Sequence, residues 1–264
     1  MNMKKIWSVF LVAAILAGCQ QDNRTTDEKF IDALKKGLSD RWELADLDKD
    51  AEETTETFES YVNAELNQIK QYKDADFEDP DLQTAADAYI ASLEHTLEIT
   101  PTLDKDSNKF YELYSPVYSE RGEALLQINE ISPLEMANQE DQKELEELLD
   151  DAEITKAATD LASQIDFKMV KEDSDEDMGW YSADLEAKVK NDTRYTFDYF
   201  NVTANIIDAD GTVITQGYTS VNAWKPDQTQ TFKLYSDKKF NNVELAKVDY
   251  MIADNGFIGE VYFE

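Results

Sequence analysis

The spacing of the apolar residues changes once along the chain, close to residue 166, and this change limits the fold more than any other feature. Before it, apolar side chains recur every three or four residues, which is the spacing of one face of an α-helix. After it they alternate with polar residues, as in strands that bury one face. The sequence therefore predicts an α+β fold with segregated halves: a helical half, residues 27–166, and a strand half, residues 167–264.

Four or five helices fit into residues 27–166. Their apolar faces begin near Phe30, Phe58, Leu82, Phe110 and Leu145. Asp79-Pro80 supplies an N-cap followed by proline at the first helical position, and Pro116 predicts a kink or an interruption of the fourth helix. The segment from Ser132 to Glu135 has capping-box spacing, so it begins either a short turn or the fifth helix. Helices of this kind joined by short loops predict an α-helical bundle.

Turn residues separate the alternating runs of the strand half. Asp208-Ala209-Asp210-Gly211 predicts a turn between two strands, and Asn255-Gly256 between two apolar runs predicts a β-hairpin. The acidic segment from Glu172 to Asp177 predicts a loop or part of the linker between the halves. Six or seven short strands without a helical pattern among them predict an antiparallel β-sandwich.

The charge of the chain excludes several classes of function. It has 25 basic and 57 acidic residues and a formal net charge of −32, so it lacks the basic face that nucleic-acid binding needs. Its one cysteine excludes an internal disulfide, and together with one histidine it leaves little for a zinc site. The glycine-rich phosphate loop, the dinucleotide fingerprint, the hydrolase elbow and the zinc-protease motif are all absent.

The N-terminus has the pattern of an export signal. Lys4 and Lys5 precede an apolar run from Ile6 to Leu16 that is too short to span a bilayer. The run ends in Leu16-Ala17-Gly18-Cys19, which resembles the lipobox of bacterial lipoproteins. The resemblance implies cleavage after residue 18 and a diacylglyceryl group on the Cys19 thiol. The alternative is an ordinary secretory signal that is cut after small residues, with Cys19 incidental.

Lipidation at Cys19 predicts a protein anchored to the cell membrane on its extracytoplasmic face. Residues 1–18 are then the signal peptide, and residues 19–26, which carry no large apolar side chain, form a short tether. Cleavage removes two lysines and no acid, so the formal charge changes from −32 to −34. Cations or basic surfaces are therefore the expected polar partners.

Three segments of the strand half are similar to a known family. They are Val189-Lys190-Asn191, Ala204-Asn205-Ile206-Ile207-Asp208 leading into Ala209-Asp210-Gly211, and Trp224-Lys225-Pro226-Asp227 ahead of a strand that contains Phe232. Over roughly Leu185–Ala253 they resemble the FxLYD domain, an immunoglobulin-like module of lipoproteins and surface proteins of Gram-positive bacteria. The resemblance implies an immunoglobulin-like sandwich and a binding or structural role, and it supplies no catalytic residues.

The sequence departs from the family's pattern at several positions. Ala204, Ile206 and Ile207 stand where the naming motif has phenylalanine, leucine and tyrosine, while Asp208 is kept. Asp227 stands where the family usually has glycine after the proline. A generic immunoglobulin-like sandwich is the alternative to membership in this family.

Candidate catalytic groups are few. His95 is the only histidine, and it lies off the apolar stripe between Glu94 and Thr96, so a solvent-facing position is expected. Sequence alone pairs it with no serine or cysteine nucleophile. Glycosidase chemistry needs two carboxylates in different environments, and no such pair stands out among so many acids.

Two acidic loops resemble the start of an EF-hand without completing it. Asp46-x-Asp48-x-Asp50 has Ala51 at the sixth position and Thr57 at the twelfth, where calcium loops need glycine and glutamate. Asp104-x-Asp106-x-Asn108 has Lys109 and Ser115 at these positions. We assign no metal ligand to either loop.

Aromatic residues offer two interpretations, recognition or packing. Trp180, beside the acidic segment, and Trp224, beside the proline turn, would be exposed anchors or core residues. Tyr114 and Tyr118 are four residues apart, so they share a helix face with Tyr111 close by. Packing is the more common use of such residues.

The sequence thus predicts a non-enzymatic binding, adhesion or structural module of the cell envelope. Its partners would be the membrane, through lipid on Cys19, and an envelope protein or polymer. The alternative is an envelope hydrolase that uses paired carboxylates with calcium as a helper. A solute-binding protein is disfavoured, since such folds alternate strands and helices. No catalytic residue, cofactor or metal ligand is assigned.

Overall fold

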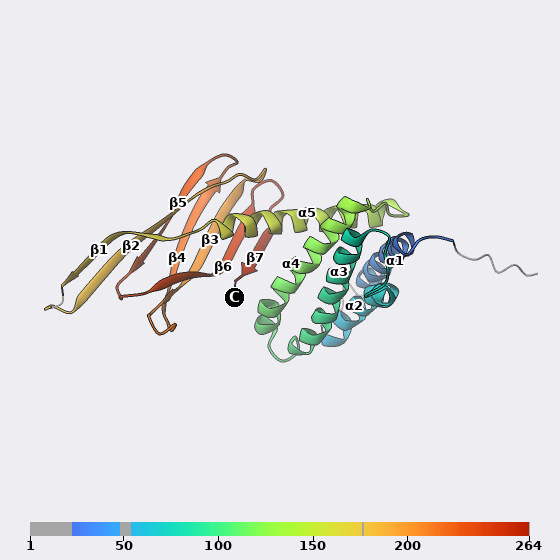
Figure 1. The fold of residues 1–264 in the computed structure, drawn as a ribbon, viewed down its shortest axis with the longest axis horizontal. Coiled ribbons are helices and arrows are strands. Elements are labelled where there is room, and N and C mark those ends of the chain that lie inside the picture. The colour runs from blue at the N-terminus through green and yellow to red at the C-terminus, as the bar shows by residue number, and fades with distance from the viewer. Residues whose placement is uncertain (1–22, 48–53, 176, 264) are drawn as a thin grey trace, which may run out of the picture.

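The fold of the chain comes from a computed structural model, which describes residues 23–47, 54–175 and 177–263 (Figure 1). Within these ranges five α-helices are followed by seven strands in two antiparallel sheets, so the predicted segregated α+β fold is confirmed. The helices are α1 (Thr26–Leu47), α2 (Thr55–Ile69), α3 (Pro80–Ile99), α4 (Ser107–Ile131) and α5 (Gln139–Ser163), with short 3-10 turns η1 (Lys70–Tyr72) and η2 (Thr100–Thr102).

Short polar side chains begin four of the helices. Thr54 and Thr57 bond reciprocally to each other's backbone N–H groups ahead of α2. Asp79 accepts hydrogen bonds from the backbone of α3, with Pro80 at its first position, as predicted. Asp106 caps α4 and Asn138 caps α5 in the same way. These N-caps fix where the four helices begin.

Two predictions about the fourth and fifth helices are settled by α4 and α5. Pro116 lies inside α4, which continues from Ser107 to Ile131, so the predicted interruption does not occur. Ser132 ends α4 rather than starting the next helix, because its backbone N–H donates to the Ile128 carbonyl. The segment behind it is the connection between the two helices, and the fifth helix begins at Gln139.

The strands are β1 (Lys168–Asp175), β2 (Trp180–Lys190), β3 (Phe197–Ile207), β4 (Val213–Trp224), β5 (Thr229–Ser236), β6 (Asn242–Ile252) and β7 (Ile258–Tyr262). One sheet has the order β1-β2-β5 and the other β4-β3-β6-β7. This is the order of an immunoglobulin-like sandwich in which the fourth strand has joined the sheet of the third. Aromatic residues fill the space between the sheets, and the fully buried ones are Phe197, Phe200, Trp224, Phe232 and Tyr250.

The turns of the sandwich follow the sequence signals. The Asp208 carboxylate accepts hydrogen bonds from the backbone N–H groups of Asp210 and Thr212, each at 2.9 Å, between β3 and β4. Asn255 accepts from the Phe257 N–H, and Gly256 has φ +73° between β6 and β7. The predicted turn and hairpin are therefore confirmed.

The acidic segment from Glu172 to Asp177 is not simply a loop. Strand β1 runs through it as far as Asp175, in register with β2. All of its residues up to Ser174 are exposed, because β1 is an edge strand with no second layer over it. Main-chain pairing alone makes this strand, so the alternation that marks a half-buried strand is missing.

Helix α5 joins the two halves, because its two ends lie in different cores. Leu145 packs in the helical core, whereas Ile154, Ala158 and Leu161 pack in the sandwich core (Figure 1). Helix α5 ends at Ser163 and β1 begins at Lys168, while the sandwich core extends back into α5.

Candidate functional site

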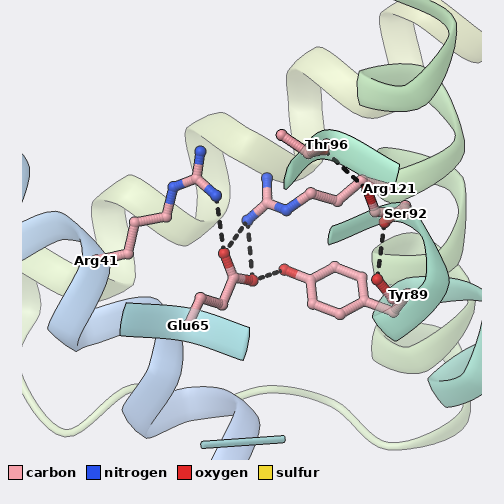
Figure 2. A network of polar contacts seen from close by, with 6 residues as sticks. All are labelled: Arg41, Glu65, Tyr89, Ser92, Thr96 and Arg121. Carbon is pink, nitrogen blue, oxygen red and sulfur yellow. Dashed lines mark hydrogen bonds and ion pairs between the residues drawn. The ribbon is translucent and has the colours of Figure 1, made fainter. Parts of the chain in front are cut away.

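A buried carboxylate lies at the centre of the helical half, held by one residue from each neighbouring helix (Figure 2). The Glu65 side chain of α2 is 0% exposed. Arg121 of α4 donates to its two oxygens at 3.1 and 3.0 Å, and Arg41 of α1 donates at 3.0 Å. The Tyr89 hydroxyl of α3 donates to the same carboxylate. The first four helices therefore meet at one ion cluster.

The charges of this cluster depend on one another. Burial alone would raise the pKa of Glu65, but Arg121, Arg41 and the Tyr89 hydroxyl hold it below its ordinary value. Burial raises the pKa of Tyr89, so its hydroxyl stays protonated and keeps donating. Beside Arg121 there is a hollow of only about 10 Å³, room for about one water molecule. The cluster therefore holds the bundle together rather than binding a ligand.

Sequence reasoning missed this cluster, although a signal for it exists. Glu65 lies on the same helix face as Phe58, Val62 and Ile69, which are all core residues. Arg121 likewise lies between Val117 and Leu125 on the buried face of α4. A charged residue in the middle of an apolar stripe is that signal.

A groove of about 970 Å³ lies between α4 and the outer face of the sheet β4-β3-β6-β7. Its lining residues are His95, Lys109, Glu112, Leu113, Pro116, Val117, Glu120, Thr203, Gln216, Tyr218, Ala246, Lys247, Tyr262 and Phe263. The sheet contributes one row in register across all four strands: Tyr218, Thr203, Lys247 and Tyr262. Tyr218 is 70% exposed.

Cations in this groove have partners in the protein. Lys247 pairs with Glu260 and lies 5.2 Å from the centre of the Tyr262 ring. Lys109 pairs with Glu112 at 2.9 Å. His95 is exposed at the edge of the groove, as predicted, and no described serine or threonine hydrogen-bonds to it. The groove thus offers tyrosine side chains and lysines that are already paired with acids.

A second, smaller hollow lies between α4, α5 and the β6–β7 end of the sandwich. We call it the junction pocket. Its volume is about 280 Å³, and its lining is Tyr111, Tyr114, Ser115, Tyr118, Ser119, Thr155, Phe257, Ile258, Gly259 and Glu260. Tyr114 and Tyr118 lie together as their spacing predicts, with ring centres 5.7 Å apart. The Ser115 hydroxyl donates to the Glu260 carbonyl at 2.9 Å and fixes α4 against β7.

The tryptophans divide between the two interpretations. Trp224 is buried in the sandwich core and its indole N–H donates to the Gln228 carbonyl at 2.9 Å, so it is a packing residue. Trp180 is 43% exposed at the start of β2. Trp42 is partly buried against the helical core.

The two acidic loops have different outcomes. Residues 48–53 of the first loop lie outside the described residues. In the second, Asp104 accepts from the Thr55 N–H at 2.9 Å and Asp106 accepts from the Lys109 N–H at 3.0 Å. These carboxylates serve the ends of α2 and α4. Within the described ranges no group of three or more histidine, cysteine, aspartate or glutamate side chains is placed to hold a metal ion.

The predicted lipidation site, Cys19, and the signal peptide lie outside the described residues. In the part of the chain that the structure covers, no helix has both the length and the apolarity that crossing a membrane requires.

The region that resembles the FxLYD domain is organised around a buried asparagine. Asn191 is 0% exposed, and its amide donates to the carbonyls of Tyr195 and Trp224 at 2.9 and 3.1 Å. Its own carbonyl accepts from the N–H of Asp227, which has φ +64°. That conformation favours glycine, the residue expected at this place. Ala204 and Ile206 point into the sandwich.

Comparison with known proteins adds little to this picture. No protein-family model matches the chain, and no curated protein matches it. Among solved structures, a structure of IrmA from Escherichia coli is 12% identical, with 37% of this chain and 80% of that chain covered. Its TM-score is 0.24, a likeness too weak to carry an argument about fold or function.

Proposed function

We propose that this chain is a membrane-anchored, extracytoplasmic lipoprotein that acts as a non-enzymatic binding module of the cell envelope. The observation that carries the proposal is the open groove of about 970 Å³ between α4 and the outer face of the sandwich. Its size is that of pockets that hold substantial ligands. Exposed Tyr218 offers the large, rigid contact area that is common at binding hot spots.

Binding is favoured over hydrolysis by where the carboxylates lie. A glycoside hydrolase needs a protonated acid and a second carboxylate about 5–10 Å away across the substrate. Burial and the neighbouring Asp150 and Glu147 raise the pKa of Asp151 to about 6. These neighbours are on the same helix as Asp151, and the carboxylate that lines the nearby junction pocket, Glu260, is paired with Lys247.

The positive φ of Asp227 and the buried Asn191 support the resemblance to the FxLYD domain. The immunoglobulin-like strand order is in keeping with it. A module of this kind on a lipoprotein fits a role in holding an envelope protein or polymer. We therefore propose that the ligand binds in the groove and that the lipid anchor is at Cys19, near the N-terminus.

The groove is tested by co-sedimentation of the purified chain with isolated Gram-positive cell walls. Replacing Tyr218 by alanine should weaken wall binding by about ten-fold or more, because a hot-spot aromatic would be lost. Tyr235→Ala is the matched control, since Tyr235 is 59% exposed on β5 and lies outside the groove. Equal binding by both variants would contradict the groove, and release of soluble wall fragments would favour the hydrolase.

The anchor is tested by labelling cells with a radioactive fatty acid. Cys19→Ala should abolish incorporation of the label, because the thiol that would carry the lipid is removed. It should leave uncleaved precursor or released protein, because two acyl chains are needed for stable anchoring. Normal labelling of this variant would contradict the lipobox assignment. Ser8→Ala, in the same signal segment, is the control and should label normally.

A further inference from the structure

The junction pocket has an unusual concentration of aromatic rings. Tyr111, Tyr114 and Tyr118 come from successive turns of α4, and Phe257 faces them from the connection between β6 and β7. At about 280 Å³ the pocket is near the lower limit for small-molecule sites, so it suits a compact head group. Its lining comes from α4 and α5 on one side and from the β6–β7 end of the sandwich on the other, so it belongs to both halves of the molecule.

The rings are held in place from behind. Tyr114 stacks on the buried Phe110 with ring centres 5.3 Å apart and an angle of 10°. Tyr118 is inclined to Tyr114 by 51° at 5.7 Å. Both rings line the pocket, so two inclined aromatic rings form a corner in its wall. Aromatic faces are electron-rich, so such a corner attracts a cation and most strongly one without tightly held water.

A carboxylate one helical turn from the pocket lining has no described cation as a partner. Asp151 lies one turn of α5 before Thr155, a lining residue, and therefore on the same helix face. It is close enough to influence the hydroxyls of both Tyr118 and Tyr250. Within the described residues it makes no ion pair and no hydrogen bond through its side chain. It is only partly exposed, so water does not fully screen its charge.

Cations on the neighbouring elements are paired with other acids. Arg121 is bound by Glu65 beneath the pocket, and Lys247 by Glu260 at its far side. Arg194 pairs with Asp150 and Glu153 along α5. No lysine or arginine lines the junction pocket itself, whose one charged lining residue is Glu260. The lining thus contributes no cation, and Asp151, one helical turn from Thr155, is the nearby carboxylate that no described cation pairs with.

The geometry points to the junction pocket as a binding site for a small organic cation, an alkylated ammonium group held by the tyrosine rings and balanced by Asp151. This inference rests on the proposed function, since it names the chemical class that a binding module of this shape would recognise. The site is separate from the groove, so each can be tested without the other.

Choline is the probe, and its neutral isostere, in which carbon replaces the quaternary nitrogen, is the matched comparison. Titration calorimetry and ligand-detected saturation-transfer NMR on the full chain should show choline binding about ten-fold or more tightly than the isostere. Equal affinity for the two compounds would overturn the inference, because shape and apolarity alone would then explain the pocket. Absence of choline binding up to 50 mM choline, an upper bound of about 2 kcal/mol of affinity by the usual conversion, would overturn it as well.

Variants locate the cation. Asp151→Asn and Tyr111→Ala should each weaken choline binding by about ten-fold, while Asp160→Asn and Tyr235→Ala should leave it unchanged. Asp160 is on the same helix but pairs with Lys156, and Tyr111 is 42% exposed, so its loss leaves the core intact. Circular dichroism and thermal melting confirm that each variant is folded. Unchanged choline binding in folded Asp151→Asn would overturn the role of the carboxylate.

The same variants separate this inference from the proposed function. If the inference about the junction pocket is wrong and the proposed function is right, choline does not bind, whereas wall co-sedimentation still depends on Tyr218. If the proposed function fails, Tyr218→Ala sediments with walls as the parent protein does, whatever choline does.

Discussion

Glu65 occupies a position on the buried face of α2 where an apolar residue would be expected. A buried carboxylate is costly unless charge and hydrogen bonds compensate for the lost water. Arg121, Arg41 and Tyr89 supply that compensation from three different helices. The cluster therefore favours one arrangement of the bundle over others that would leave Glu65 unpaired.

Replacing Glu65 by glutamine leaves the buried Arg121 without its counter-ion. We expect the free energy of unfolding to fall by about 3–5 kcal/mol, the usual cost of breaking a buried pair. Denaturant unfolding of the two proteins measures it. The double variant Glu65→Leu with Arg121→Met should recover at least half of the loss, because it removes both members of the most deeply buried ion pair. No recovery would show that shape rather than charge dominates at this position.

The same cluster predicts how stability depends on acid. The pKa of Glu65 is lower in the folded protein than its ordinary value of 4.5. Its contribution is therefore complete at neutral pH and is lost as the pH falls below that value toward the folded pKa. Between about pH 5 and pH 2 the stability difference between the parent and Glu65→Gln should shrink. A constant difference over that range would contradict the assigned charge state.

At the scale of elements, one aromatic side chain of β6, Tyr250, contacts both β7 and α5. Tyr250 of β6 extends over Gly259 of β7, and its hydroxyl donates to the Thr155 hydroxyl of α5 at 3.1 Å. A Cβ at position 259 would overlap both the hydroxyl and the ring of Tyr250. Glycine at this position is thus required by the contact between sandwich and helix.

Gly259→Ala should therefore lower the stability by about 1–3 kcal/mol, the range for overpacking a tight core. Gly217→Ala is the control, since its new Cβ would meet only the end of the Leu234 side chain at 2.9 Å. Thermal unfolding compares the two. If Gly217→Ala costs as much as Gly259→Ala, the Tyr250 contact is not the limiting one.

Local signals made some elements predictable from the sequence and left others out of reach. Asp79-Pro80 and Asn255-Gly256 act on their own neighbours in the chain, so the start of α3 and the last hairpin follow from them. In strand β1 every residue from Lys168 to Ser174 is exposed, so its sequence lacks the alternation of apolar and polar residues that marks a half-buried strand. The junction pocket joins residues more than 100 positions apart, such as Tyr118 and Phe257, and only tertiary packing brings them together.

At the scale of the whole molecule, α5 makes the two halves depend on one another. Its first part packs in the helical core and its second part in the sandwich core. Loss of either core would leave apolar residues of α5 exposed. The halves therefore differ in architecture while sharing one helix.

We expect the two halves to unfold in one transition. Far-ultraviolet circular dichroism, which is dominated by the helices, and fluorescence of the buried Trp224 in a variant with Trp42 and Trp180 replaced by phenylalanine should report the same midpoint, since shared packing couples the halves. The calorimetric and van't Hoff enthalpies should then agree. Two separated midpoints would show that the contact through α5 is too weak to couple them.

The shared helix has a mechanical consequence. In Figure 1 the first helix and the tip of the β1–β2 hairpin lie at opposite ends of the long axis, and α5 runs between the two cores. If the groove holds a wall ligand while the N-terminus is anchored, the part of a shear load on the cell that falls on the sandwich passes to the bundle through α5 and through the contact of α4 with β7. Because Ile154 and Leu161 are embedded in the sandwich and Leu145 in the bundle, the helix resists being peeled from either end. Under tension the protein would then behave as one rigid body rather than as two domains joined by a flexible hinge.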